Sequence, residues 1–170
     1  SHGIKAGDRV ILSAGSDFSF VFGYLGAHLI GAVAIPLDPN LPNKRLEWIT
    51  QKTQPKAVFW AKERPGCIPI QQLHSKTTGN IPTDISFPES SSPADILFTS
   101  GTTGESKGVV LTHQNLRSAV TNINTFIGNT DDDREVLPLP LSHSFGLGRL
   151  RCVLSAGGTL ILTNGFTRAK

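Results

Sequence analysis

Methionine is absent from this chain of 170 residues, and cysteine is nearly absent. The two cysteines, Cys67 and Cys152, form no CxxC pair and have no histidine at ligand spacing. We therefore expect reduced, structural thiols and no metal site of the Cys/His type. Because the chain begins with Ser1 and lacks methionine, we also expect it to be a piece of a longer protein.

Clustered charge and long apolar runs are lacking too. Lys and Arg number 16 against 13 Asp and Glu, and the basic residues are scattered, which predicts no nucleic-acid partner. No apolar run approaches the length of a membrane span, and the first residues show no apolar core of signal-peptide type. With 38% hydrophobic and 17% charged residues, the composition is typical of a globular protein, and we expect a cytoplasmic one.

Hydrophobic periodicity predicts alternating strands and helices in the first part of the chain, residues 1–61. Asp17 is a plausible N-cap, and Pro42 is suited to open a helix. The order favours an α/β fold with a mostly parallel sheet in Rossmann-like layers and right-handed crossovers. The predicted elements are strands at 9–14, 32–39 and 56–61, a helix from Phe18, and a helix at 42–53.

Two further parts follow. Residues 62–93 are rich in Pro, Ser, Thr, Gln and Gly and predict a long, partly mobile surface connection, with only "CIPI" as a candidate strand. Residues 94–170 return to ordered patterns, although the charged stretch 130–135 is interpreted as a solvated turn. The predicted elements there are strands at 95–100, 108–112 and 158–163, an extended segment at 136–141, a helix at 144–157, and a helix capped by Thr112 whose apolar face holds Leu116, Ala119, Val120, Ile123, Phe126 and Ile127.

The stretch "LFTSGTTGESKGVVLTH", residues 97–113, joins two apolar runs through small and polar residues. Its glycines allow positive φ and close approach of a ligand to the backbone, so that successive N–H groups can converge on an anion. Its hydroxyls donate hydrogen bonds, and its lysine adds a positive charge, which together suit a polyphosphate. The candidate residues are Thr99, Ser100, Gly101, Thr102, Thr103, Gly104 and Lys107.

A glycine-rich hairpin turn is the plainer interpretation, but a turn needs one or two special residues, not ten. The stretch is also not a Walker A loop, because Ser106 precedes the lysine where glycine belongs and Gly108 follows it where Ser or Thr belongs. The run after Lys107 is strand-like, so we predict a hairpin-like pair of strands around the loop. A dinucleotide fingerprint is absent as well.

Residues 98–116, "FTSGTTGESKGVVLTHQNL", resemble the phosphate-binding signature of the adenylate-forming (AMP-binding) superfamily. Acyl-CoA synthetases, luciferase and peptide-synthetase adenylation domains belong to it. Residues 25–49 and 137–147 resemble two further blocks of that family, in the same order. The resemblance covers most of the chain except 62–93, and it departs from the family at Ser106, where proline is usual.

The resemblance implies a partial N-terminal domain of an ATP-dependent, AMP-forming acid–thiol ligase. In that reaction a carboxylate attacks the α-phosphate of ATP, and coenzyme A or a carrier-protein thiol then takes the acyl group. It implies ATP with Mg²⁺, a carboxylic acid such as a fatty acid, and phosphate binding by the loop residues named above. It also implies a catalytic His143 at an acyl and thiol pocket, beside Phe145 and Gly146. Sequence context alone leaves His143 equally open to a core or turn role.

The family's downstream Tyr-Gly-x-Thr-Glu block has no counterpart, since the only tyrosine is Tyr24, followed by Leu25. The lysine that the family's small C-terminal domain brings to the α-phosphate is missing as well. We therefore expect an N-terminal fragment that is inactive alone. A short, non-catalytic nucleotide- or anion-binding module is the alternative, and a Rossmann-like scaffold is a weaker one.

Overall fold

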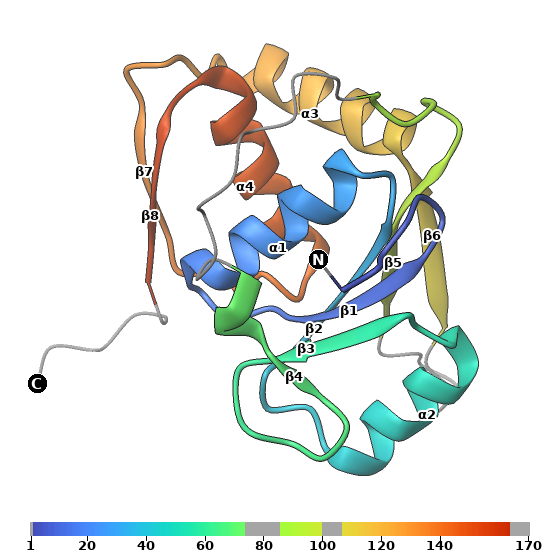
Figure 1. Ribbon diagram of the computed structural model, residues 1–170. Coiled ribbons are helices and arrows are strands. Elements are labelled where there is room, and N and C mark those ends of the chain that lie inside the picture. The colour runs from blue at the N-terminus through green and yellow to red at the C-terminus, as the bar shows by residue number, and fades with distance from the viewer. Residues whose placement is uncertain (1, 74–85, 100–106, 164–170) are drawn as a thin grey trace, which may run out of the picture.

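A six-stranded sheet forms the centre of the molecule in the computed structural model, which describes residues 2–73, 86–99 and 107–163 (Figure 1). The strand order is β4-β3-β1-β2-β5-β6, and every pair is parallel except the antiparallel β5–β6. This confirms the predicted α/β class and the mostly parallel sheet. The strands are β1 (Arg9–Ser13), β2 (Val33–Leu37), β3 (Ala57–Trp60), β4 (Ile68–Pro69), β5 (Pro93–Phe98) and β6 (Gly108–Thr112).

Helices cover both faces of this sheet (Figure 1). Helix α2 lies on one face, and α1 lies on the other, beside α4 and a separate parallel pair of strands, β7–β8. None of the helices in the described ranges is both long and apolar enough to cross a membrane. The remaining elements are α1 (Phe18–Leu29), α2 (Asn43–Thr53), the 3₁₀ turn η1 (Ile70–Leu73), α3 (His113–Ile127), β7 (Arg134–Leu137), α4 (Ser144–Ala156) and β8 (Thr159–Leu162).

The apolar run of β1 is continuous because both faces of the sheet are buried. Side chains alternate between faces along a strand. Val10 and Leu12 belong to the core cluster on the α1 side, whereas Ile11 belongs to the cluster beneath α2. All three are at most 2% exposed.

Local capping chemistry starts α1 and α3 where the sequence predicted. The Asp17 side chain accepts a hydrogen bond from the backbone N–H of Phe20, 3.0 Å away, at the start of α1. At the start of α3, Thr112 and Asn115 form a reciprocal capping box. This box turns the chain from the end of β6 directly into α3.

Two stretches differ from the sequence interpretation. The end of the supposed solvated turn at 130–135 is strand β7, because Arg134 and Glu135 pair with Thr159 and Leu160 of β8. In the supposed surface connection, β4 forms from the predicted "CIPI" strand and pairs with β3, and Ile70 is fully buried. The apolar residue at this position anchors the segment to the core, which composition alone did not reveal.

Candidate functional site

The two ends of the glycine-rich stretch are held together at the end of the β5–β6 hairpin. The backbone N–H of Thr99 donates to the carbonyl oxygen of Lys107 at 3.0 Å, and Lys107 is exposed. Of the candidate phosphate-binding residues, these two are described. The other five, Ser100, Gly101, Thr102, Thr103 and Gly104, lie outside the described residues.

Strand β6, not a helix, follows Lys107. This confirms the predicted hairpin-like pair and excludes the Walker A arrangement, in which a helix N-terminus follows the lysine. Gly108 stands opposite Phe98 in the ladder. A side chain there would come within 3.1 Å of the Ile96 side chain and 3.4 Å of the Phe98 ring. The glycine after the lysine therefore has a packing role that keeps the two strands close.

The predicted histidine block forms the start of α4. His143 is the exposed N-cap residue, and its carbonyl accepts from the N–H of Leu147 at 3.1 Å, while its side chain makes no cap hydrogen bond. Its exposure excludes the core-histidine interpretation. Phe145 is 68% exposed. Gly146 is buried, and a methyl group on it would lie 2.3 Å from the carbonyl oxygen of Pro140.

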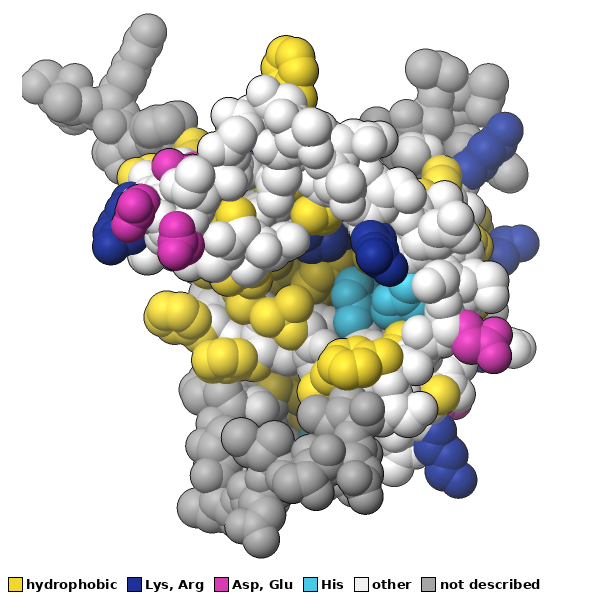
Figure 2. Space-filling model, turned by 90° about the horizontal axis from the view of Figure 1, so that it is seen from above, with side chains coloured by type: hydrophobic (Ala, Val, Ile, Leu, Met, Phe, Trp, Pro, Cys, Tyr) yellow, Lys and Arg dark blue, Asp and Glu magenta, His cyan; other side chains and the backbone are white. Residues whose placement is uncertain are grey.

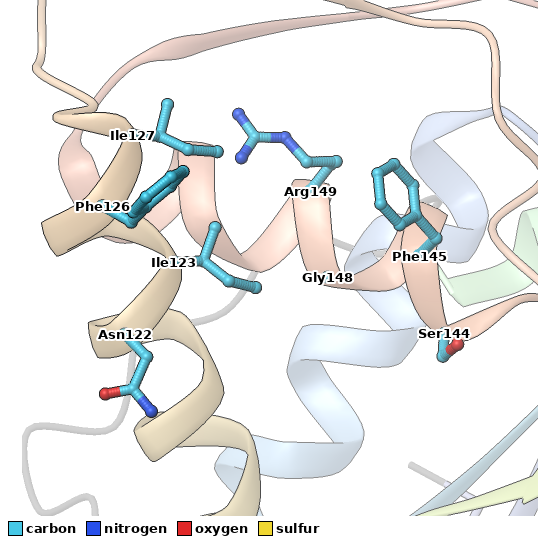
Figure 3. A pocket seen from close by; sticks show the side chains of 8 residues that line it. All are labelled: Asn122, Ile123, Phe126, Ile127, Ser144, Phe145, Gly148 and Arg149. Atoms are coloured by element: carbon cyan, nitrogen blue, oxygen red, sulfur yellow. The ribbon is translucent and has the colours of Figure 1, made fainter.

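An apolar groove of about 500 Å³ runs between α3 and α4 and begins at this block (Figure 3). Sequence analysis placed Ile123, Phe126 and Ile127 on the apolar face of their helix. The structure leaves Phe126 91% and Ile127 54% exposed, on the side that lines the groove. Its lining residues are Asn122, Ile123, Phe126, Ile127, Ser144, Phe145, Gly148 and Arg149.

The one positively charged lining residue, Arg149, has a fixed partner. Its Nε donates to Oε1 of Glu135 at 2.9 Å, and its Nη2 contacts the other carboxylate oxygen, so that the pair is bidentate. The same Nη2 lies 3.5 Å from the side-chain oxygen of Asn129. The hydrogen bonds to Glu135 raise the pKa of Arg149. The groove therefore contains a cation whose charge is already balanced.

A buried polar network, which sequence analysis missed, ties β5 to α1 and α4. Asp95 is fully buried and accepts from the Tyr24 hydroxyl at 2.8 Å and from Arg151 at 3.1 Å. Nε2 of His28 lies 2.8 Å from its other oxygen. Burial, reinforced by the Asp95 charge, raises the pKa of Tyr24 well above its ordinary value. The available signal was an acidic residue inside the otherwise apolar strand "PADILF".

A second hollow lies between α1 and α3, where Figure 2 shows two histidines at the bottom of an apolar-walled depression. They are His28 and His113, whose rings are 5.4 Å apart. Burial lowers the pKa of His113, and the neighbouring His28 lowers it further. The hollow has a volume of about 740 Å³, and Arg117 stands on its rim.

The described residues contain no group of three or more His, Cys, Asp or Glu side chains placed to hold a metal ion. Both cysteines have free thiols, and burial raises the pKa of each. Reduced, structural cysteines were the sequence prediction.

The fold is of the α/β class, with a mostly parallel sheet and a hairpin whose two strands flank a glycine- and hydroxyl-rich stretch. The chain matches the family described as AMP-binding enzyme over residues 1–170, and it belongs to that family. The mitochondrial malonate–CoA ligase of Homo sapiens is 32% identical over 94% of this chain and 31% of that protein. The long-chain-fatty-acid–CoA ligase FadD13 of Mycobacterium tuberculosis is 30% identical over 99% and 37%.

Solved structures agree on the fold. The o-succinylbenzoate CoA synthetase of Bacillus subtilis, in complex with an acyl-adenylate intermediate, superimposes with a TM-score of 0.85 at 24% identity. The match covers 98% of this chain and 46% of that one. The chain thus spans about a third of the length of the curated ligases it matches.

Proposed function

We propose that this chain is part of an AMP-forming acid–thiol ligase. The enzyme activates a carboxylic acid with ATP as the acyl-adenylate and then transfers the acyl group to coenzyme A or a carrier-protein thiol. The observation that carries the proposal is the β5–β6 hairpin, which holds Thr99 and Lys107 side by side at the ends of a glycine- and hydroxyl-rich stretch. Membership of the AMP-binding family and the two CoA-ligase relatives support it.

The proposed roles follow from charge and exposure. Residues Thr99 to Gly104 donate hydrogen bonds to the phosphates of ATP, and Lys107 adds the positive charge at the end of the loop. Attack on the α-phosphate requires charge neutralisation and alignment of the reacting atoms, which such a loop can supply. His143 and Phe145 are exposed at the start of α4, where they contact the acyl or thiol part, and Phe145 lines the apolar groove. Gly146 keeps this helix start against Pro140.

Magnesium enters this proposal with the nucleotide. Mg²⁺ is commonly held by one or two carboxylates together with substrate phosphates, not by a cage of protein ligands. The ion would offset phosphate charge beside Lys107.

The test compares Lys107→Ala with His143→Ala in a full-length enzyme that carries this chain. ATP–pyrophosphate exchange is measured with titrated ATP and a panel of fatty, aromatic and short acids. A charge-assisted hydrogen bond contributes about 1.5–3 kcal/mol, so Lys107→Ala should weaken ATP use about tenfold to a hundredfold. His143→Ala should change the dependence on acid or thiol and leave ATP affinity nearly intact. The exposed Lys56, replaced by alanine, is the matched control.

If Lys107→Ala used ATP as well as the parent enzyme, the glycine-rich stretch would be a turn without a phosphate-binding role, and the proposal would be wrong. Binding of ATP by the parent enzyme without exchange on any acid would instead favour the non-catalytic nucleotide-binding module.

A further inference from the structure

We infer that the Asp95–Arg151 ion pair, oriented by the Tyr24 hydroxyl, positions the candidate phosphate loop relative to the candidate acyl and thiol block. Asp95 lies in β5, which leads into the loop, and Arg151 lies in α4, whose N-cap residue is His143. The pair acts through the elements that carry it, so its members are positioning residues and not groups that contact substrate. This inference rests on the proposed function, because it concerns the rate of that same reaction.

The three side chains form a closed triangle of hydrogen bonds on the face of the sheet that α1 and α4 cover (Figure 1). Oδ2 of Asp95 accepts from the Tyr24 hydroxyl at 2.8 Å and from Nη1 of Arg151 at 3.1 Å. The same Nη1 donates to the Tyr24 oxygen at 2.6 Å. His28 contacts the other carboxylate oxygen, so both oxygens of Asp95 have partners. Because each contact of the triangle restrains the other two, the guanidinium is held in one place relative to β5.

The ion pair lies at similar distances from the two halves of the candidate site. Asp95 precedes Thr99 by four residues, which is about 13 Å along a strand. Arg151 follows His143 by eight residues, which is about 12 Å along a helix. A shift of α4 against β5 would therefore change the distance between the phosphate loop and the acyl and thiol block. A misplacement of about 1 Å at the reacting atoms can lower a rate about a hundredfold.

Apolar packing alone would not fix this arrangement. Leu97 of β5 and Leu147 and Leu150 of α4 belong to one core cluster, and apolar contacts have no preferred direction. Nε of Arg151 is buried and has no hydrogen-bond partner among the described residues, which costs free energy. Replacement of a buried ion pair by apolar side chains of similar volume is often neutral or stabilising. The arginine is therefore better explained by the single register that it imposes on α4 and β5 than by stability.

The experiment measures ATP–pyrophosphate exchange with titrated ATP in a full-length enzyme that carries this chain, using the acid that the parent enzyme uses best. The double variant Asp95→Asn with Arg151→Met contains neither buried charge. The introduced amide keeps Tyr24 and His28 as partners, so the midpoint of urea unfolding should stay close to that of the parent. The kcat of this variant, divided by the folded fraction from circular dichroism, should fall about tenfold to a hundredfold, while its KM for ATP stays within about threefold.

Two further variants complete the experiment. Tyr24→Phe keeps the ion pair but opens the triangle, so it should lower kcat by a smaller factor at an unchanged KM for ATP. Ile70→Ala is the matched control for stability, because Ile70 is fully buried in the same core cluster but follows the edge strand β4, with three strands between β4 and β5. It should lower the midpoint of urea unfolding, and its kcat per folded enzyme should equal that of the parent.

The outcomes separate this inference from the proposed function. If the parent enzyme shows no exchange on any acid, the proposed function fails and this inference fails with it. If the parent is active and the double variant keeps the parent's kcat per folded enzyme, the function stands and the inference is overturned. A rise in KM for ATP as large as the fall in kcat would also overturn it, since the pair would then act on ATP binding. If the double variant does not fold, Tyr24→Phe decides, and an unchanged kcat overturns the inference.

Discussion

Removal of the Asp95 side chain is the sharpest test of what holds α1, β5 and α4 together. Asp95→Ala deletes a fully buried carboxylate that the Tyr24 hydroxyl, His28 and Arg151 all contact within 3.1 Å. The guanidinium of Arg151, whose side chain is only 14% exposed, then loses the carboxylate that balances its charge. Breaking a buried ion pair from one side costs about 3–5 kcal/mol.

That loss is a large part of the roughly 5–15 kcal/mol by which a domain is stable. For a chain of this size it corresponds to a fall in Tm of roughly 10 °C. The assay is urea unfolding followed by circular dichroism, with thermal melting as a second measurement. Asp132→Ala, at an exposed position, is the control and should change the free energy of unfolding by less than about 0.5 kcal/mol.

Tyr24→Phe separates the hydrogen bond from the ion pair. It removes the hydroxyl, which donates to Asp95 and accepts from Arg151, and leaves the Asp95–Arg151 ion pair in place. Two hydrogen bonds of about 0.5–1.5 kcal/mol each give an expected loss of about 1–3 kcal/mol, smaller than that of Asp95→Ala. If Asp95→Ala cost less than about 1 kcal/mol, the carboxylate would not be the centre of the network. The physical account of how these three elements are joined would then be wrong.

Three further predictions concern α4, α3 and the whole chain. Gly146→Ala should lower the free energy of unfolding by about 1–3 kcal/mol, because its methyl group meets backbone atoms of Pro140. Gly148→Ala should raise the free energy of unfolding by about 0.5–1 kcal/mol. If thermal melts placed the two variants in the reverse order of stability, they would contradict the packing described. The pKa of His113 is lowered in the fold, so as the pH falls the unfolded chain binds a proton at this histidine before the folded chain does. The contribution of His113 to the free energy of unfolding is therefore complete above about pH 6.5 and is lost as the pH falls toward the lowered pKa. In urea titrations across this window, His113→Gln should show a shallower dependence on pH than the parent, and equal slopes would exclude the effect. The 170 residues alone should show no ATP–pyrophosphate exchange above a protein-free control, since the relatives named as ligases are about three times longer; clear exchange would show that these residues suffice.

Local sequence determined most of the secondary structure. The alternation of apolar runs and helical periodicity predicted the parallel strands, because buried parallel strands are apolar on both faces. The caps at Asp17 and Thr112 could be predicted from the sequence, because the free N–H groups at a helix start need an acceptor within a few residues along the chain. The hairpin around the candidate phosphate loop could also be predicted from the sequence, because the two apolar runs that flank the loop are short and close in sequence.

Tertiary structure decided which side chains meet. Asp95 lies 71 residues from Tyr24 and 56 from Arg151, and no periodicity in the sequence encodes that contact. The sequence predicted an apolar face for α3, yet only Leu116 on it is buried. Ile123, Phe126 and Ile127 border a groove whose other wall, α4, comes later in the chain. Amphipathic spacing shows that a helix has an apolar face, but whether that face is covered depends on where the neighbouring elements lie.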